Sequence, residues 1–379
     1  MVTTPNHRFI LCAAFLVLLV APISRAQQPA SPSVQPLRVA IAGLAHGHVD
    51  GFFKTYLQDP RIQVVGVAEA DQQVAASYAA RYGLPRNLMF SDLDAMLQAT
   101  HPQAVLVYTT TFDHRRTVEI CARHGVDVMM EKPLAVSLED AKAIQRAAQD
   151  GKIQVIVNYE TTWHRSNQAV FALAHQGALG DIRKIVIHDG HQGPVEIGVK
   201  PPFLTWLVDP KLNGAGALFD FGCYGADLMT WMMHGEAPLT VTAVLNTDKP
   251  QIYPHVDDDA TVVLTYPRAQ AVLQASWNWP FGRKDMEVYG ATGYAITVGA
   301  DKLRLRRPGE SDERLISAPS LNSPEQDSLS YLAAVIRGQI HPRGDLSALD
   351  TNIVVMQILD AARESARTGK TVKLSRLGD

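Results

Sequence analysis

Segments of strand character alternate with segments of helical spacing between residues 37 and 157, and this alternation constrains the fold more than any other feature. Strands are predicted over 37–42, 63–68, 104–108, 126–130 and 153–157. Helices are predicted over 49–57, 72–82 and 138–149, with another ending near His124. Such alternation is typical of a parallel sheet that helices cover on both faces. We therefore predict an N-terminal α/β domain with a doubly wound parallel sheet.

The pattern changes after Asn158. Segments with period-two character follow a helix at 167–175, and two helices are predicted near the end of the chain, over 325–337 and 346–368. The predicted strands cover 182–188, 240–246, 260–266, 271–279 and 286–290. Because 379 residues exceed what one core usually supports, two domains are expected. We predict a doubly wound domain over 37–158 and an α/β domain with an open, largely antiparallel sheet over 159–379.

The first 26 residues have the layout of a secretory signal peptide. His7 and Arg8 precede an apolar stretch from Phe9 to Ile23, and small residues follow at Ser24-Arg25-Ala26. This stretch is shorter than the roughly 20 residues that a spanning helix needs. We expect export to the periplasm, cleavage, no membrane anchor thereafter and a flexible lead-in over 27–36. An uncleaved N-terminal anchor is the alternative.

Charge and cysteine content exclude some classes of function. The chain has 35 basic and 38 acidic residues, so no basic excess exists to neutralise phosphates, and we expect no nucleic-acid partner. Removal of the signal peptide would leave Cys121 and Cys223. They lie in different predicted segments, and we expect two buried free thiols instead of a disulfide.

A turn that could bind a dinucleotide follows the first predicted strand. Gly43-Leu-Ala45-His46-Gly47-His48 stands where a G-x-G-x-x-G pattern would lie, although only its first glycine is in register. Glu69 ends the second strand, where an acid would accept hydrogen bonds from ribose hydroxyls. A carboxylate there would repel a 2′-phosphate, so NAD is favoured over NADP. A solvated acid at a strand end is the alternative interpretation of Glu69.

Two histidine pairs could suggest a metal site. They are His46 with His48, and His188 with His191. No acid or cysteine cluster completes either pair in the sequence, so we predict no metal. His46 and His48 are then either cofactor contacts or polar turn residues.

Three side chains suggest proton and hydride chemistry. Lys132 follows an apolar strand, where a parallel sheet delivers side chains to its ligand crevice. Asp220 and Tyr224 are four residues apart, so one helix would present both from one face. A nearby ammonium would lower the pKa of Tyr224 toward that of a useful base, and Asp220 could orient a substrate hydroxyl. Alternatively, Lys132 is a loop lysine and Asp220 a helix cap.

These residues stand in motifs that resemble the Gfo/Idh/MocA oxidoreductase family. The motifs are Glu131-Lys132-Pro133, Gly177–Gly180, Gly214–Gly222 and Ser365–Gly369. The resemblance covers residues 37–374. It implies an NAD-binding Rossmann domain, a sugar-binding second domain, and an open sheet that forms a subunit interface. It also implies that Glu131 and Lys132 contact the cofactor, that Lys132 also contacts the substrate, and that the peptide bond to Pro133 is often cis.

The chain departs from the family pattern at several positions. The nucleotide turn has fewer glycines than usual, and Thr109-Thr-Thr-Phe112 replaces a Thr-Pro pair, although His114 fits. By resemblance, Thr109 and His114 are candidate cofactor contacts. Tyr224 stands where the family often has histidine, which is similar to the exported glucose–fructose oxidoreductase branch. Either Tyr224 or Lys132 could therefore accept the proton.

The segment after the last Rossmann strand offers hydroxyl-binding groups. Asn158, Trp163, His164 and Arg165 are candidates to line the cleft between domains. Trp163 could lie against a pyranose ring or pack the domain junction. Trp277 and Trp279 are predicted to pack within the sheet or an interface.

Three functions follow from these predictions. The first is an exported, homo-oligomeric dehydrogenase that oxidises a secondary hydroxyl of a pyranose or pyranoside, with C3 of a glycoside preferred by analogy. The second is an NAD-dependent glycosidase that acts by transient oxidation and elimination. The third is a non-catalytic sugar-sensing protein on the same fold.

Overall fold

The structure is a computed structural model that describes residues 1–3 and 35–375. The predicted signal peptide lies, apart from its first three residues, outside the described part of the chain. So does nearly all of the predicted lead-in. Over the described residues, no helix has the length and apolar character needed to cross a membrane.

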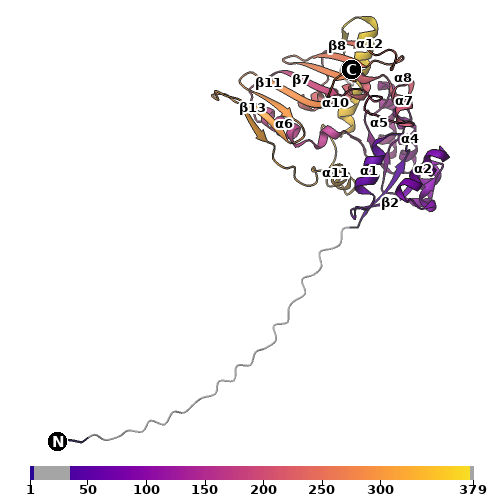
Figure 1. Cartoon of the computed structure of the whole chain (residues 1–379), viewed down its shortest axis with the longest axis horizontal. Coiled ribbons are helices and arrows are strands. Elements are labelled where there is room, and N and C mark those ends of the chain that lie inside the picture. Colours follow the sequence, from indigo (N-terminus) through magenta and orange to yellow (C-terminus); the bar gives the residue numbers. More distant parts are fainter. Residues whose placement is uncertain (4–34, 376–379) are drawn as a thin grey trace. The chain divides into compact units, whose positions relative to one another are not determined.

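A six-stranded parallel sheet, in the order β3-β2-β1-β4-β5-β6, belongs to the N-terminal part of residues 36–375, which is coloured indigo to purple in Figure 1. Its strands are β1 (Leu37–Ala42), β2 (Ile62–Ala68), β3 (Met89–Phe90), β4 (Ala104–Val107), β5 (Asp127–Glu131) and β6 (Val155–Asn158). Its helices are α1 (His48–Tyr56), α2 (Gln72–Tyr82), α3 (Leu93–Thr100), α4 (His114–Arg123) and α5 (Leu138–Gly151). The predicted doubly wound sheet is confirmed.

The strand order reverses between β1 and β4, and this reversal positions the site. At such a point, the connections after the two neighbouring strands run to opposite faces of the sheet. This leaves a crevice at the carboxyl ends of these strands. The turn after β1 and the end of β5 both lie at this edge. The strands themselves are apolar and buried on both faces, as the wholly buried β4 shows.

A nine-stranded mixed sheet forms the second half, in the order β14-β13-β12-β11-β7-β10-β9-β8-β15. All neighbours are antiparallel except β7 and β10. The strands are β7 (Ile182–Gly190), β8 (Thr240–Asn246), β9 (Asp259–Thr265), β10 (Gln270–Ser276), β11 (Arg283–Gly290), β12 (Tyr294–Val298), β13 (Lys302–Arg306), β14 (Arg314–Ser317) and β15 (Val372–Lys373). The predicted largely antiparallel sheet is confirmed.

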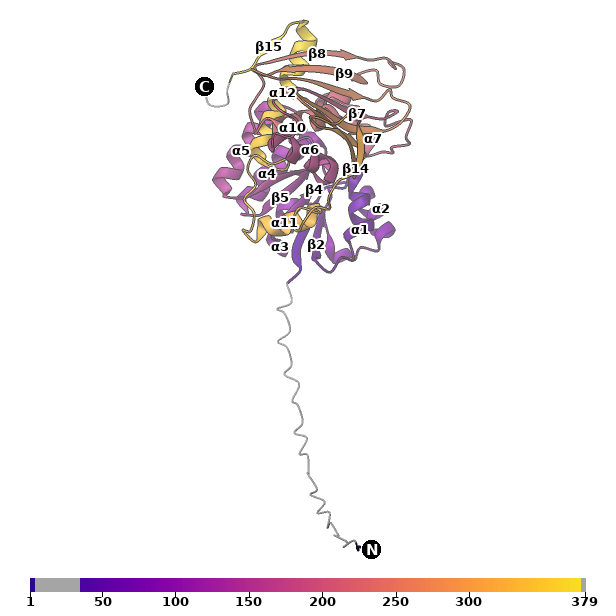
Figure 2. The ribbon, with the colours of Figure 1, turned by 90° about the vertical axis from the view of Figure 1, so that its left-hand side faces the viewer.

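The second part of the chain also contains the helices α6 (Arg165–His175), α7 (Phe203–Leu207), α8 (Pro210–Asn213), α9 (Ala217–Asp220), α10 (Gly222–Met232), α11 (Ser328–Ile336) and α12 (Leu349–Thr368). Of these, α6, α9, α10 and α12 contact strands of the second sheet, whereas α11 packs into the core that surrounds β1. Strand β9 alternates strictly between buried and partly buried residues, so its side chains are fully covered on one face only. Figure 2 shows β8 and β9 as one layer with α10 and α12 beneath it.

The end of the chain returns to the first sheet. Helix α12 contacts α5 and β6 as well as α10 and β8. Ala348 forms an isolated bridge with Ile156, and α11 packs into the core that surrounds β1. The sheets therefore separate at Asn158, whereas the helices that cover them are shared.

Several elements are absent from the prediction, among them α3 and the strands β12, β13 and β14. Strand β3 has two residues and α7, α8 and α9 have four or five, too few for periodicity to reveal them. The segment with Asp220 and Tyr224 forms two helices, since Asp220 ends α9 and Tyr224 lies in α10. Cys121 and Cys223 are free and buried, as expected.

We predict that the contact between α11 and the first sheet stabilises the fold. Leu332 in α11 is 1% exposed within the core around β1. Leu332→Ala should lower the free energy of unfolding by about 2–5 kcal/mol, measured by urea denaturation. The control Leu315→Ala, at a side chain that is 62% exposed in β14, should change it by less than about 0.5 kcal/mol. Equal effects would contradict this assignment.

Candidate active site

A cavity of 1080 Å³ lies at the carboxyl edge of the first sheet and reaches the helices of the second. Its wall includes the nucleotide turn at Gly47 and His48, the strand end at Lys132, and the helix pair at Asp220 and Tyr224. The three predicted catalytic side chains therefore meet in one space, although 88 residues separate Lys132 from Asp220.

Lys132 and Asp220 form a buried ion pair. The Lys132 Nζ lies 2.6 Å from Asp220 Oδ1 and 2.9 Å from the Asp220 carbonyl oxygen. The two side chains are 6% and 9% exposed, so both charges are largely removed from water. The peptide bond between Lys132 and Pro133 is cis, as the family resemblance implied. Neither residue is the isolated loop lysine or helix cap of the alternative interpretation.

The charges of this pair stabilise each other. Burial alone would lower the pKa of Lys132, but the Asp220 carboxylate more than offsets this and raises it above its usual value. Burial would likewise raise the pKa of Asp220, and the adjacent ammonium instead holds it below its usual value. Both groups are therefore ionised near neutral pH.

Trp277 orients the acid. Its indole Nε1 donates a hydrogen bond to Asp220 Oδ2 at 3.0 Å, and the ring is fully buried. The sequence indicated packing for Trp277, and only the fold shows that it lies just beyond the end of β10, facing Asp220. With one oxygen on Lys132 and the other on Trp277, the carboxylate has one orientation.

Tyr224 presents its ring to the lysines. Lys132 Nζ and Lys284 Nζ lie 5.1 Å and 4.5 Å from the ring centroid, a cation–π arrangement. Burial raises the pKa of Tyr224 well above its usual value. This corrects the expectation that a nearby ammonium lowers that pKa, because burial of the phenolate dominates and Cys223 and Glu160 nearby raise the pKa further.

The turn after β1 fits a dinucleotide. Gly43 has a φ of +80°, and a Cβ there would lie 2.6 Å from the Thr109 side chain. Glu69 accepts hydrogen bonds from the backbone N–H of Leu44 at 2.7 Å and of Asp71 at 2.9 Å. The carboxylate is thus held against the turn at the end of β2, where the sequence placed the ribose contact.

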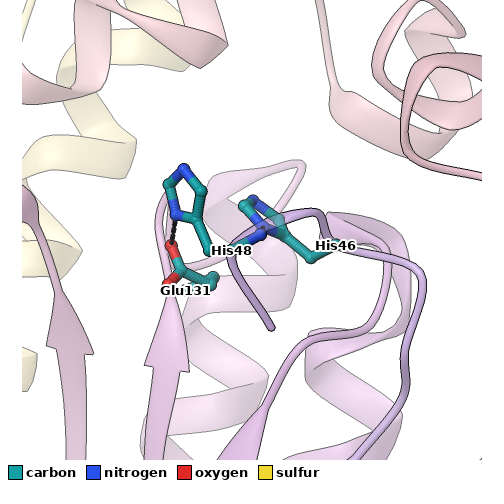
Figure 3. Close-up of side chains that lie close together, drawn as sticks. All are labelled: His46, His48 and Glu131. Carbon is teal, nitrogen blue, oxygen red and sulfur yellow. Dashed lines mark hydrogen bonds and ion pairs between the residues drawn. The ribbon is translucent and has the colours of Figure 1, made fainter. Parts of the chain in front are cut away.

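His46 and His48 of this turn lie close to Glu131 at the end of β5 (Figure 3). His48 Nδ1 is 3.0 Å from Glu131 Oε2, and His46 Nδ1 accepts a hydrogen bond from the His48 backbone N–H at 3.2 Å. Burial lowers the pKa of His46 well below its usual value, so its imidazole is neutral. The expectation that no acid completes this histidine pair is wrong, because β5 brings Glu131 across 83 residues of sequence.

His114 supports the strand end from behind. Its Nδ1 lies 3.1 Å from the Pro133 carbonyl oxygen and 3.3 Å from that of Leu134. Burial lowers the pKa of His114 to about 4, so the ring is neutral and Nδ1 donates to these carbonyls. Its Nε2 is buried and has no hydrogen-bond partner. The predicted cofactor contacts Thr109 and His114 therefore shape the walls behind the cavity.

The fold places only some of the predicted substrate residues at the cavity. His164 lines the cavity, whereas Asn158, Trp163 and Arg165 are not among the lining residues. Trp163 packs against Tyr331 with ring centroids 5.6 Å apart, and its Nε1 donates to Asn158 Oδ1 at 3.0 Å. The junction-packing alternative for Trp163 is thus confirmed. Arg165 pairs with Asp301.

The fold adds cavity residues that sequence reasoning missed. Lys284 forms an ion pair with Glu160, and His164 with Lys284 holds the pKa of Glu160 well below its usual value. His191 also lines the cavity, and its Nδ1 accepts a hydrogen bond from the Gly193 backbone N–H at 2.9 Å. These residues come from β11, the turn after β6 and the end of β7. No local spacing links them.

Helix α7 packs against the nucleotide turn. The Trp206 Nε1 donates to the Ala45 carbonyl oxygen at 3.1 Å, and the ring centroids of Phe203 and His46 are 4.5 Å apart. A Cβ on Gly47 would lie 2.6 Å from the Phe203 ring. Gly47 thus permits the second half of the chain to close over the turn.

Comparisons with known proteins agree with this geometry. Residues 37–159 match the family described as "Oxidoreductase family, NAD-binding Rossmann fold", and residues 167–296 match "GFO/IDH/MocA C-terminal domain". The chain is 30% identical over 334 residues to D-apiose dehydrogenase of Paraburkholderia graminis, a match that covers 83% of this chain and 84% of that protein.

Two further relatives show how far the likeness extends. Trans-1,2-dihydrobenzene-1,2-diol dehydrogenase of Xenopus tropicalis is 27% identical over 220 residues, which is 56% of this chain and only 61% of that protein. The crystal structure of aldose-aldose oxidoreductase from Caulobacter crescentus, complexed with glycerol, superposes with a TM-score of 0.73 at 25% identity. That match covers 89% of this chain and all of the other.

We predict that breaking the buried pair destabilises the protein in a pH-dependent way. Lys132→Met leaves the Asp220 carboxylate buried without its cation and should cost about 3–5 kcal/mol of unfolding free energy near neutral pH. The folded pKa of Asp220 is depressed, so the pair contributes fully above about pH 4 and its contribution is lost as the pH falls through the folded value.

The difference in unfolding free energy between wild type and Lys132→Met should therefore stay constant above about pH 4 and narrow only as the pH falls below it, measured by urea denaturation on both sides of that pH. Lys142→Met, at an exposed position of α5, is the matched control and should leave stability unchanged at every pH. A pH-independent difference for Lys132→Met would contradict the ion-pair assignment.

Proposed function

Since this chain belongs to the Gfo/Idh/MocA oxidoreductase family, we propose that it catalyses the NAD-dependent oxidation of a secondary hydroxyl in a sugar. The observation that carries this proposal is the buried Lys132–Asp220 pair in the wall of the cavity that also borders the nucleotide turn. A sensor would have no need to bury two charges beside a cofactor turn, so this pair favours an enzyme over the non-catalytic alternative.

The N-terminal half is an NAD-binding Rossmann domain by its family match. Gly43, Ala45, Gly47 and His48 would hold the pyrophosphate side of NAD, and Glu69 would accept from the adenosine ribose. The bound cofactor would supply the acceptor for the substrate's hydride. The Glu69 carboxylate lies against the turn and would repel a 2′-phosphate, which favours NAD over NADP.

The substrate would lie against Lys132, His164, His191 and Lys284. These groups offer several hydrogen-bond donors, which suits a molecule with many hydroxyls. The relatives named for D-apiose and for aldoses support a sugar. We extend this to a pyranose or pyranoside, with C3 of a glycoside as the preferred position of oxidation.

The Lys132–Asp220 pair would take the hydroxyl proton as one unit. The raised pKa values of Lys132 and Tyr224 mean that both start protonated, so neither is a free base. Lys132 can accept the substrate proton only as it passes one of its own to Asp220 Oδ1, 2.6 Å away. This favours Lys132 over Tyr224 as the group that contacts the hydroxyl, with Asp220 as the final proton acceptor.

We further propose that the protein is exported and assembles as a homo-oligomer. The apolar stretch over residues 9–23 supports export, and the second sheet, with one face left partly exposed, supports assembly through that face. Recovery of the protein in a periplasmic fraction tests export. Size-exclusion chromatography with light scattering measures the mass of the assembly and so tests oligomerisation.

The first experiment identifies the nicotinamide released from purified, denatured protein before and after incubation with a panel of glycosides. Conversion of bound NAD to NADH by one glycoside would support the dehydrogenase and name its substrate. Cleavage of the glycoside while NAD stays oxidised would favour the glycosidase. Absence of bound NAD, together with failure to bind added NAD, would contradict the proposal.

We predict that Asp220→Asn lowers kcat by about 10²- to 10⁴-fold, because the amide keeps the shape of the side chain but cannot accept the proton. NADH absorbance with the identified substrate measures the rate. Trp277→Phe removes only the indole N–H that orients Asp220 and should lower kcat by about 10- to 100-fold. A wild-type kcat in Asp220→Asn would exclude Asp220 as the acceptor.

A further inference from the structure

His46, His48 and Glu131 have the chemistry of a transition-metal site. Each offers one ligand atom, and the three atoms lie within 4.8 Å of one another. Ligands of a tetrahedral Zn²⁺ at 2.0–2.1 Å from the ion lie roughly 3.3 Å apart, so small side-chain rotations would bring this set into range. Two imidazoles and one carboxylate suit Zn²⁺ and its neighbours better than Mg²⁺ or Ca²⁺, which prefer oxygen.

The contacts that hold the three residues are ones that an ion could replace. His46 is 2% exposed, and its Nδ1 accepts a hydrogen bond from the His48 backbone N–H at 3.2 Å. The charge of Lys132 is held by Asp220 on the other side of the strand end. Glu131 is 3% exposed and has His48 as its ion-pair partner.

A second cluster in the described part of the chain differs from the first because a side-chain cation already lies among its ligand atoms. His188, Asp285 and Glu287 also bring three ligand atoms together. There the Arg283 guanidinium already occupies the centre, 2.6 Å from Asp285, 3.7 Å from Glu287 and 3.2 Å from the His188 Nδ1. A bound cation would have to displace this arginine, whereas no such cation stands between His48 and Glu131.

The cluster also has an open side. The His48 side chain is 49% exposed and lines the cavity, so water or a ligand could complete the coordination from there. An open fourth position distinguishes reactive or regulatory zinc sites from closed structural ones.

We propose that His46, His48 and Glu131 bind one divalent ion of the Zn²⁺ class when the dinucleotide is absent, and that the ion and NAD exclude each other. The exclusion rests on the proposed function, because His48 and Glu131 are also assigned to the cofactor. Binding of the ion would hold the nucleotide turn to the end of β5 and so keep the enzyme inactive until NAD displaces it.

Co²⁺ is the probe, because its absorption spectrum reports tetrahedral nitrogen and oxygen ligands directly. The untagged, nucleotide-free protein is titrated with Co²⁺ and then with Zn²⁺. We expect one Co²⁺ per chain with a tetrahedral spectrum that Zn²⁺ abolishes. His48→Gln and Glu131→Gln should each weaken binding by at least about 100-fold. His48 is half exposed, so His48→Gln should keep the thermal unfolding midpoint of wild type.

Two matched controls test whether the bound Co²⁺ lies at this cluster and not at another histidine. His188→Gln alters the second cluster, and His175→Gln alters a histidine pair whose ring centroids are 4.0 Å apart. Both should leave Co²⁺ affinity unchanged. Absence of Co²⁺ binding, or Co²⁺ binding that survives in folded His48→Gln and Glu131→Gln, would overturn the site.

Addition of NAD separates this proposal from the proposed function. Loss of the Co²⁺ spectrum as NAD binds would support the exclusion. A spectrum that persists while NAD binds, measured by nucleotide fluorescence, would overturn the exclusion. If NAD does not bind and the Co²⁺ results hold, the cofactor assignment fails while the metal site stands.

Discussion

The ion pair between Lys132 and Asp220 is the contact on which the rest of the structure depends. Lys132 directly follows β5 of the first sheet, and Asp220 ends the short helix α9, which contacts the second sheet. Burying either charge alone costs several kcal/mol, so each side chain is tolerable only where the other lies. The pair therefore sets how the two sheets meet, and the cavity between them follows.

The end of β5 serves two purposes because consecutive side chains leave a strand in opposite directions. Glu131 turns toward His48 and the nucleotide turn, whereas Lys132 turns toward Asp220 and the substrate side. One rigid element thus connects the cofactor and substrate sides of the cavity. A change in the charge of Glu131 or Lys132 would therefore alter the electrostatics of both the cofactor side and the substrate side of the cavity.

The second half of the chain also closes over the nucleotide turn. Trp206 and Phe203 of α7 contact Ala45, His46 and Gly47, so the turn is shaped by residues that lie about half the chain away. The missing glycines of the turn are explained in part by this arrangement. His46 caps the His48 N–H itself, and Gly47 is retained where the Phe203 ring leaves no room for a Cβ.

The sequence by itself indicated a doubly wound sheet followed by a largely antiparallel one, most of the longer helices, and the three side chains that meet in the cavity, but it did not indicate β12, β13 and β14. Hydrophobic periodicity reports which residues are buried locally. A lysine directly after a buried parallel strand is expected at the carboxyl edge of the sheet, where the ligand crevice lies. Tertiary structure alone decided that Trp277 orients Asp220, that Glu131 joins the two histidines, and that Trp163 packs against Tyr331 instead of lining the cavity. It also reversed the expected shift in the pKa of Tyr224. These outcomes depend on distances across 57 to 168 residues of chain and on the depth of burial, and no local pattern encodes either.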